Sequence, residues 1–224
     1  MALAPLFPIL HPILKSTFPN CLWRGQIHKP EITLTFDDGP HPEYTPQLLE
    51  VLDRYNIKAN FFWLGICVDR YPEIAKAVYE KGHWIGLHGY EHISFPQLTL
   101  IQLKNSLQKT QLAIYQACGL EQKLVRDVRP PNGIFTPEIL KLLHQWGYRS
   151  VMWSVVPEDW VRPGISVVVN RVIQQTHNGS IIVLHDGYYG GQDVAKTVAE
   201  IIPILLNKDY QFISVEQMWG ITTK

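Results

Sequence analysis

Strand and helix signals alternate along the whole chain of 224 residues, and this alternation restricts the fold more than any other feature. Short runs of β-branched and apolar residues predict strands, whereas apolar residues three or four positions apart predict helices. Their alternation is typical of a parallel sheet whose strands are joined by helices. The sequence predicts strands at 31–36, 58–63, 83–88, 124–129, 148–155, 180–185 and 210–214, and helices at 45–55, 72–81, 98–118, 136–146, 166–175 and 194–206.

Helix-end signals support these bounds. Thr45 and Thr136 each precede a proline, and a threonine N-cap followed by proline in the first helical position predicts a helix start. Gly82 and Gly119 stand where a glycine commonly ends a helix. Seven strand–helix units fit a barrel better than a flat sheet. We therefore predict a single barrel domain over residues 30–219, preceded by an irregular arm over residues 1–29 that is anchored by Phe18, Leu22 and Trp23.

Composition excludes several classes of function. Lys and Arg together equal Asp and Glu together at 20 each, so no basic surface for nucleic acid or anionic membrane is predicted. The three cysteines fit neither a disulfide framework nor a zinc ribbon. No basic residue precedes the apolar run at 1–14, and no run is long enough to span a bilayer. By these signals alone the protein is cytoplasmic, but the compartment stays open, and nothing implies a protein partner.

Two adjacent acidic residues, Asp37 and Asp38, end the first predicted strand and are followed by Gly39 and Pro40. Successive strand side chains point to opposite faces, but where the chain turns at Gly39 both carboxylates can reach one point from two directions. That arrangement suits one metal-binding carboxylate and one proton acceptor. The alternative is a solvated turn, because Asp-Gly and Gly-Pro are common turn formers.

His88 and His92 lie four residues apart, just after the third predicted strand. A separation of four can place both imidazoles on one side of a turn or short helix, although nine histidines also produce such a pair by chance. With Asp38 they would form a set of two imidazoles and one carboxylate that leaves a position open for water. This is the ligand set of a catalytic zinc site, not of a structural one.

Further polar residues follow later strands. Arg129 precedes a rigid proline-rich loop, where it is either a surface arginine or the partner of a buried carboxylate. Asp159 and Trp160 alone indicate only an acidic turn with an aromatic residue. His185 ends a very apolar strand and is either a satisfied core histidine or a partner of Asp159. Catalytic groups gather at the carboxyl ends of barrel strands, so we expect these residues at one mouth.

Five motifs occur in order at the strand ends: Thr35–Gly39, His88–His92, Arg129–Gly133, Asp159-Trp160 and Val183–His185. In this order they resemble the polysaccharide deacetylases, carbohydrate esterase family 4, over about residues 32–215. The resemblance implies a deformed (β/α)7 barrel. It also implies a metal-dependent hydrolase of non-peptide amide C–N bonds, which removes N-acetyl groups from N-acetylglucosamine-containing oligo- or polysaccharides.

The resemblance implies a role for each matching residue. Asp37 matches the general base, and Asp38, His88 and His92 match the ligands of one divalent metal. Zinc is our first choice, although cobalt or nickel also suits such a set.

Arg129 matches the arginine that tethers the base, His185 matches the general acid, and Asp159 matches the carboxylate that assists this histidine. Asn132 matches the residue whose main-chain N–H binds the oxyanion. The positions that line the substrate groove are matched by Trp160 and Leu184.

Four positions depart from the family pattern, and one of them, Val183 in place of leucine, is conservative. Gly89 stands where serine or threonine is usual, which removes a hydroxyl that steadies the loop between the histidines. Asn132 stands where tyrosine is common, and Val156 replaces an aspartate. No reactive group is lost, but two alternatives stay open: a hydrolase of small non-sugar amides or cyclic imides, and a non-catalytic carbohydrate-binding domain. The family usually acts outside the cytoplasm, in contrast to the absence of a visible export signal here.

Overall fold

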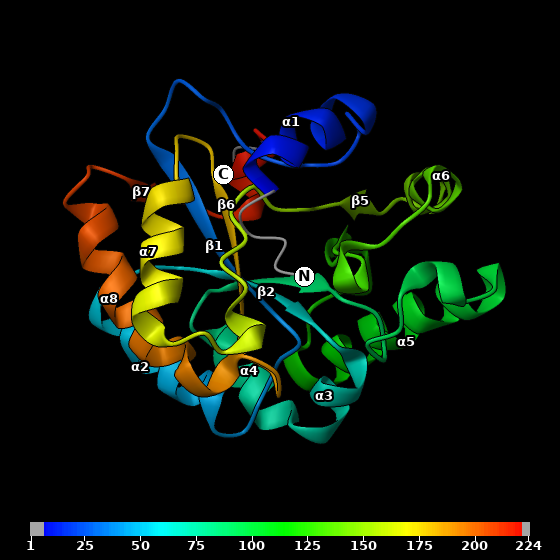
Figure 1. Ribbon diagram of the computed structural model, residues 1–224. Helices are drawn as coiled ribbons and strands as arrows, with labels where there is room; N and C mark the ends of the chain where they lie inside the picture. The colour runs from blue at the N-terminus through cyan, green and yellow to red at the C-terminus, as the bar shows by residue number, and fades with distance from the viewer. Residues whose placement is uncertain (1–6, 221–224) are drawn as a thin grey trace.

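The computed structural model describes residues 7–220, which form one parallel sheet that curls into a barrel (Figure 1). The main strand order is β5-β4-β3-β2-β1-β6, and β7 pairs with the start of β1. A single bridge between Val155 and Ile182 closes the circle. The barrel is deformed, because closure rests on one bridge and three strands have only two residues each. This agrees with the predicted deformed (β/α)7 barrel. The strands are β1 (Glu31–Asp37), β2 (Asn60–Trp63), β3 (Trp84–Leu87), β4 (Asp127–Val128), β5 (Arg149–Ser150), β6 (Ile181–His185) and β7 (Gln211–Phe212).

Helices surround the sheet. Helix α8 packs against both α2 and α7 on one side of β1, and α5 packs against α3 and α4 on the other (Figure 1). The α-helices are α1 (Phe7–Thr17), α2 (Tyr44–Arg54), α3 (Gly65–Arg70), α4 (Pro72–Glu80), α5 (Leu100–Cys118), α6 (Pro137–Gln145), α7 (Ile165–Gln175), α8 (Val194–Leu206) and α9 (Val215–Met218). Short 3-10 helices are η1 (Phe95–Gln97), η2 (Gln122–Leu124), η3 (Pro131–Gly133), η4 (Asp159–Val161) and η5 (Gly191–Asp193).

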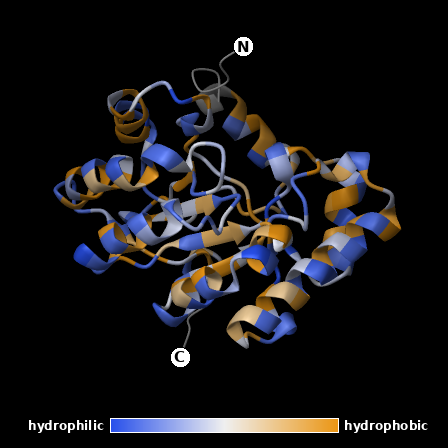
Figure 2. Cartoon of the chain, turned by 90° about the horizontal axis from the view of Figure 1, so that it is seen from below, coloured by the Kyte–Doolittle hydropathy of each residue, from blue (hydrophilic) through white to orange (hydrophobic). Residues whose placement is uncertain are grey.

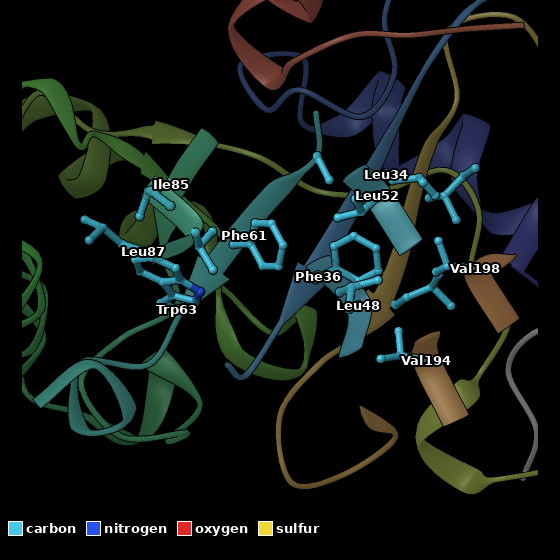
Figure 3. Close-up of a cluster of buried hydrophobic side chains, with 14 of the residues drawn as sticks. Leu34, Phe36, Leu48, Leu52, Phe61, Trp63, Ile85, Leu87, Val194 and Val198 are labelled. Atoms are coloured by element: carbon cyan, nitrogen blue, oxygen red, sulfur yellow. The ribbon is translucent and has the colours of Figure 1, made fainter. Parts of the chain in front are cut away.

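The two-residue period of the strands separates the hydrophobic core from the barrel interior. Leu34 and Phe36 of β1 point outwards and pack beside Leu48 and Leu52 of α2 and Val198 of α8 (Figure 3). Burial of such side chains supplies most of the drive to fold. The alternate residues of β1, which face the interior, are polar: Thr33, Thr35 and Asp37.

The polar residues inside the barrel bond to one another. Asn60 of β2 donates to the Thr33 hydroxyl at 2.6 Å, and its side-chain oxygen accepts the Val215 N–H at 2.8 Å. Nearer the other end of the strands, Thr35 accepts a bond from Arg129 at 2.7 Å. Polar side chains are thus hydrogen-bonded at both ends of the barrel interior, and Asp37 lies at the carboxyl end of β1.

The N-terminal arm differs from the irregular segment that we expected, because Phe7–Thr17 forms α1. Pro8 stands in the first turn, where a missing N–H costs nothing, and Pro12 is accommodated within the helix. The predicted anchors Phe18, Leu22 and Trp23 all pack into hydrophobic clusters.

Residues after α1 fill a gap in the barrel wall. The N–H of Leu22 donates to the Ser150 carbonyl at 2.9 Å, and the N–H of Met152 donates to the Leu22 carbonyl at 2.8 Å. Gly25 donates to the carbonyl of Gly179, just before β6, at 2.8 Å. The arm therefore lies between β5 and β6 as an additional extended segment of the barrel wall.

Several local expectations need correction. Thr45 is not the N-cap of α2, which begins at Tyr44; its hydroxyl instead donates to buried Asp186 at 2.5 Å. Thr136 does cap α6, accepting the N–H of Ile139. The predicted strands at 124–129 and 148–155 shorten to β4 and β5, and α3 and α9 were not predicted.

The helices carry both hydrophilic and hydrophobic residues (Figure 2). Within residues 7–220, none of them is long and apolar enough to cross a membrane.

Candidate active site

Strand ends bring four predicted residues to one mouth of the barrel. Asp37, the last residue of β1, is in register with His185, the last residue of β6. His88 follows β3 and its N–H donates to Trp63 at the end of β2 at 2.8 Å. Arg129 follows β4, and its N–H donates to Leu87 at the end of β3 at 2.9 Å. The neighbouring strands thus end at one level, with polar side chains on the interior side.

Asp38, His88 and His92 converge as the motifs indicated. Asp38 adopts a left-handed conformation with φ 73° as the chain leaves β1, which turns its carboxylate towards the histidines. Asp38 Oδ1 lies 3.4 Å from His88 Nε2 and 3.4 Å from His92 Nε2. His88 and Asp38 are buried, whereas His92 stands at the open side.

The ring of His88 is oriented for coordination. Its Nδ1 lies 2.7 Å from the Arg129 carbonyl, and because a carbonyl can only accept, Nδ1 carries the proton. Nε2 therefore presents its lone pair towards Asp38. Burial lowers the pKa of His88, against the raising effects of Asp37 and Asp38, and so favours the neutral imidazole that binds metals.

These residues fit a divalent metal ion. Asp38 Oδ1 is buried without a hydrogen-bond partner among the described residues, although two imidazole nitrogens face it. A cation satisfies all three donor atoms. In a tetrahedral site with bonds of about 2.0–2.1 Å, ligand atoms lie about 3.3–3.4 Å apart, close to the spacing found here.

Asp37 is held in a buried ion pair. Arg129 Nη1 lies 2.6 Å from Asp37 Oδ1, and both side chains are almost completely buried. Arg129 also donates to the carbonyl of Met152 at 2.8 Å, and its guanidinium lies over the Phe62 ring. The arginine is therefore rigid, and it places a positive charge directly beside the Asp37 carboxylate. The other oxygen, Oδ2, faces the metal site, 3.9 Å from His88 Nε2.

His185 pairs with Asp159 across the mouth. Its Nδ1 lies 2.8 Å from Asp159 Oδ1, and its main-chain N–H donates to Asp159 Oδ2 at 2.8 Å. Burial lowers the pKa of His185, but the Asp159 carboxylate, together with Asp38 and Asp37, raises it to about 10 overall. The Asp159 carboxylate therefore favours the protonated imidazole, the form that a proton donor requires.

The three predicted substrate-contacting residues lie in different surroundings. Trp160 is 36% exposed, and its ring meets that of His185 edge-on at 5.2 Å between centroids. Asn132 is exposed on η3, where its amide donates to the Ser94 hydroxyl at 2.9 Å. Leu184 is fully buried in the main core, on the face of β6 opposite His185, so its side chain does not reach the mouth.

Supporting residues were not visible in the sequence. Arg171 of α7 bonds to buried Glu158 at 3.2 Å and to the Pro157 carbonyl at 2.8 Å, which fixes the turn before Asp159. Ser106 of α5 accepts the N–H of Tyr90, midway between the two metal histidines, at 2.8 Å. Each of these bonds joins segments that only the folded chain brings together.

Ser106 bonds to the loop directly beside Gly89. Gly89 has φ 86°, a conformation that favours glycine, and the Ser106 hydroxyl accepts the N–H of the next residue. We expect Ser106→Ala to weaken metal affinity about tenfold, the lower end of the effect of losing an outer-shell partner. Metal-binding isotherms test this, with exposed Ser166→Ala as the control and Ser106→Thr expected to restore affinity. Unchanged affinity in Ser106→Ala contradicts the assignment.

Comparison with known proteins agrees with this geometry. The family described as polysaccharide deacetylase matches residues 24–151. A peptidoglycan-N-acetylglucosamine deacetylase of Bacillus cereus is 35% identical over 204 residues, which cover 88% of this chain and 91% of that protein. A chitooligosaccharide deacetylase of Bradyrhizobium sp. is 31% identical over 198 residues, covering 84% and 90%.

Solved structures show the same fold. The crystal structure of a peptidoglycan N-acetylglucosamine deacetylase in complex with 4-naphthalen-1-yl-N-oxidanyl-benzamide matches with a TM-score of 0.88 at 29% identity, covering 95% of this chain and 99% of that one. A carbohydrate esterase family 4 pseudoenzyme from Bacillus anthracis matches with a TM-score of 0.80 at 28% identity, covering 88% and 67%.

The barrel and the residues at its mouth are those of a hydrolase of amide C–N bonds. The chain belongs to the polysaccharide deacetylase family. The predicted family, fold and enzyme class are therefore confirmed. A divalent-metal site of Asp38, His88 and His92 agrees with this membership.

Proposed function

We propose that this protein is a zinc-dependent deacetylase of N-acetylglucosamine oligo- or polysaccharides. The named relatives that act on peptidoglycan and chitooligosaccharides support this substrate class. The observation that carries the proposal is the pairing of Asp37 with Arg129 directly beside the Asp38, His88 and His92 set. Two imidazoles and one carboxylate favour zinc over the harder cations magnesium and calcium.

The first chemical step belongs to Asp37. A divalent ion held by Asp38, His88 and His92 polarises an acetyl carbonyl and acidifies water when it is bound. Asp37 Oδ1 is occupied by Arg129, so Oδ2 is the oxygen that accepts a proton as water adds to the acetyl carbon. The main-chain N–H of Asn132 is our candidate for binding the developing oxyanion.

The second step belongs to His185. Its imidazolium donates a proton to the amide nitrogen as the C–N bond breaks, which gives acetate and a free amino sugar. Asp159 bonds to Nδ1 and leaves Nε2 to face the reacting atoms. Trp160, in edge contact with the same ring, is our candidate for one wall of the sugar site.

Acetate release from a panel of substrates tests the proposed function. We expect zinc-loaded protein to deacetylate N-acetylglucosamine oligomers, activity to vanish after chelation, and zinc or cobalt to restore it. His88→Ala should lose both metal and activity. Ring opening of small imides with no acetate release would favour the alternative hydrolase. Sugar binding without turnover would favour a non-catalytic carbohydrate-binding protein. The pseudoenzyme from Bacillus anthracis has the same fold, so the fold alone does not establish catalysis.

The pH dependence should report the Asp159–His185 pair. His185 must be protonated to act, so kcat/KM should fall at high pH as this residue titrates near its raised pKa of about 10. Asp159→Asn removes the main raising influence while burial still lowers the pKa, so the alkaline limb should move towards the ordinary imidazole value of about 6.5. The acid limb should stay almost in place. Superimposable profiles of wild type and Asp159→Asn would show that His185 is not the acid or that Asp159 does not control it.

A further inference from the structure

Two adjacent tyrosines project from the rim of the active site without a packing role in the core. Tyr188 and Tyr189 are 78% and 70% exposed, although each carries a large aromatic ring. Their ring contacts are with each other, at 5.5 Å between centroids, and between Tyr188 and His41 at 6.4 Å. An exposed aromatic cluster next to a catalytic centre indicates a binding surface.

The loop that carries these tyrosines is held tightly against the catalytic residues. A Cβ added to Gly187 would lie 2.5 Å from Asp38 Cβ, and one added to Gly190 would lie 3.2 Å from His185 Cβ and 3.3 Å from the Trp160 backbone. The main chain on both sides of the tyrosine pair therefore touches the reaction centre. Their position beside the site follows from this packing.

His41 extends the same surface from the loop that follows β1. It comes three residues after Asp38, and its ring stacks on Tyr44 at 3.9 Å between centroids. Its Nδ1 accepts the main-chain N–H groups of Glu43 at 3.2 Å and Tyr44 at 3.3 Å. Because Nδ1 is an acceptor, Nε2 carries the proton in the neutral ring and remains a hydrogen-bond donor.

This combination matches one kind of ligand. A pyranose ring has an apolar face of C–H groups and an edge of hydroxyls, and tyrosine offers a rigid apolar face with a hydroxyl at its end. Imidazole N–H adds a donor for a sugar oxygen. The surface is continuous with the residues that act on the acetyl group, so its occupant belongs to the same substrate chain.

We propose that Tyr188, Tyr189 and His41 form a subsite for the sugar ring adjacent to the one that is deacetylated. The inference rests on the proposed function and makes it more specific, because it requires an oligomeric substrate. Trp160 contacts His185 directly and borders the reacting sugar, whereas the tyrosines lie beyond Gly187 and bind its neighbour.

Chain-length dependence tests the subsite. We expect kcat/KM of the zinc-loaded wild type to rise from the N-acetylglucosamine dimer to the tetramer. In the Tyr188→Ala/Tyr189→Ala variant, the tetramer-to-dimer ratio should fall about tenfold, the size expected for two lost aromatic contacts. The double phenylalanine variant should retain most of the ratio. Tyr115→Ala, which removes an exposed tyrosine from α5, is the matched control and should leave the ratio unchanged.

A binding measurement separates failure of the subsite from failure of the proposed function. In zinc-loaded Asp37→Asn protein, the double alanine change should weaken the Kd for the tetramer about tenfold by calorimetry. If the wild type releases no acetate but the double alanine change still weakens tetramer binding, the proposed deacetylase function is wrong and the sugar-binding subsite is supported. If the double alanine change alters neither the tetramer-to-dimer ratio of kcat/KM nor the Kd for the tetramer, the proposed subsite is wrong.

Discussion

Replacement of Asp37 by asparagine is expected to lower kcat about 10²–10⁴-fold, the range typical of losing a general base. Asparagine has nearly the same shape but cannot accept the proton from water. The zinc content should remain close to one ion per chain, because Asp38, His88 and His92 are unchanged. Steady-state kinetics and metal analysis of the same sample measure both quantities.

Asp38→Asn is the matched variant for this experiment, since it makes the same chemical change one residue away. It should lose metal affinity first and activity as a consequence, with partial rescue at high zinc concentration. If both variants lost metal to the same extent, the separate roles given to the two aspartates would be wrong.

Arg129→Met should lower the free energy of unfolding by about 3–5 kcal/mol, because it leaves the Asp37 carboxylate buried without its counter-charge. The Thr35 hydroxyl and the carbonyl of Met152 also lose a donor. Activity per folded molecule should fall about 10²-fold, as expected when a catalytic group shifts position. Urea unfolding at fixed zinc concentration measures the stability change.

A double-mutant cycle gives this prediction its control. Asp37→Asn combined with Arg129→Met should cost less stability than the two single changes together, because the unpaired charge is gone. Arg149→Met breaks a partly buried pair, in which Arg149 bonds to Asp127 twice at 2.7 Å, away from the mouth. It should destabilise the protein without changing kcat. Additive effects of the first two changes would contradict direct coupling of Asp37 and Arg129.

The sequence placed several candidate residues at one mouth because strand period and strand ends are local properties. Asp37, His88, Arg129 and His185 each end or follow a strand, and parallel strands place such residues at one mouth. The left-handed turn at Asp38 was implied only by the glycine that follows it. Order along the chain then gave the roles that we propose for these residues.

Other features could not be predicted, because they depend on contacts between distant segments. The bond between Ser106 and the loop of Tyr90 joins a helix to a turn, and its serine has no distinctive pattern. Helix α1 carries prolines that local rules count against helices. Thr45 resembles a cap, yet its hydroxyl is taken by Asp186, 141 positions away.

The arm that fills the barrel wall has a consequence for chemistry at the mouth. Leu22 is bonded to Ser150 and Met152, and the carbonyl of Met152 in turn holds the guanidinium of Arg129. Three bonded links thus connect the N-terminal segment to the oxygen of Asp37 that is paired with Arg129. Shortening the chain to the start of the family match at residue 24 would remove the first link, so a segment remote from the substrate helps to set the position of the base.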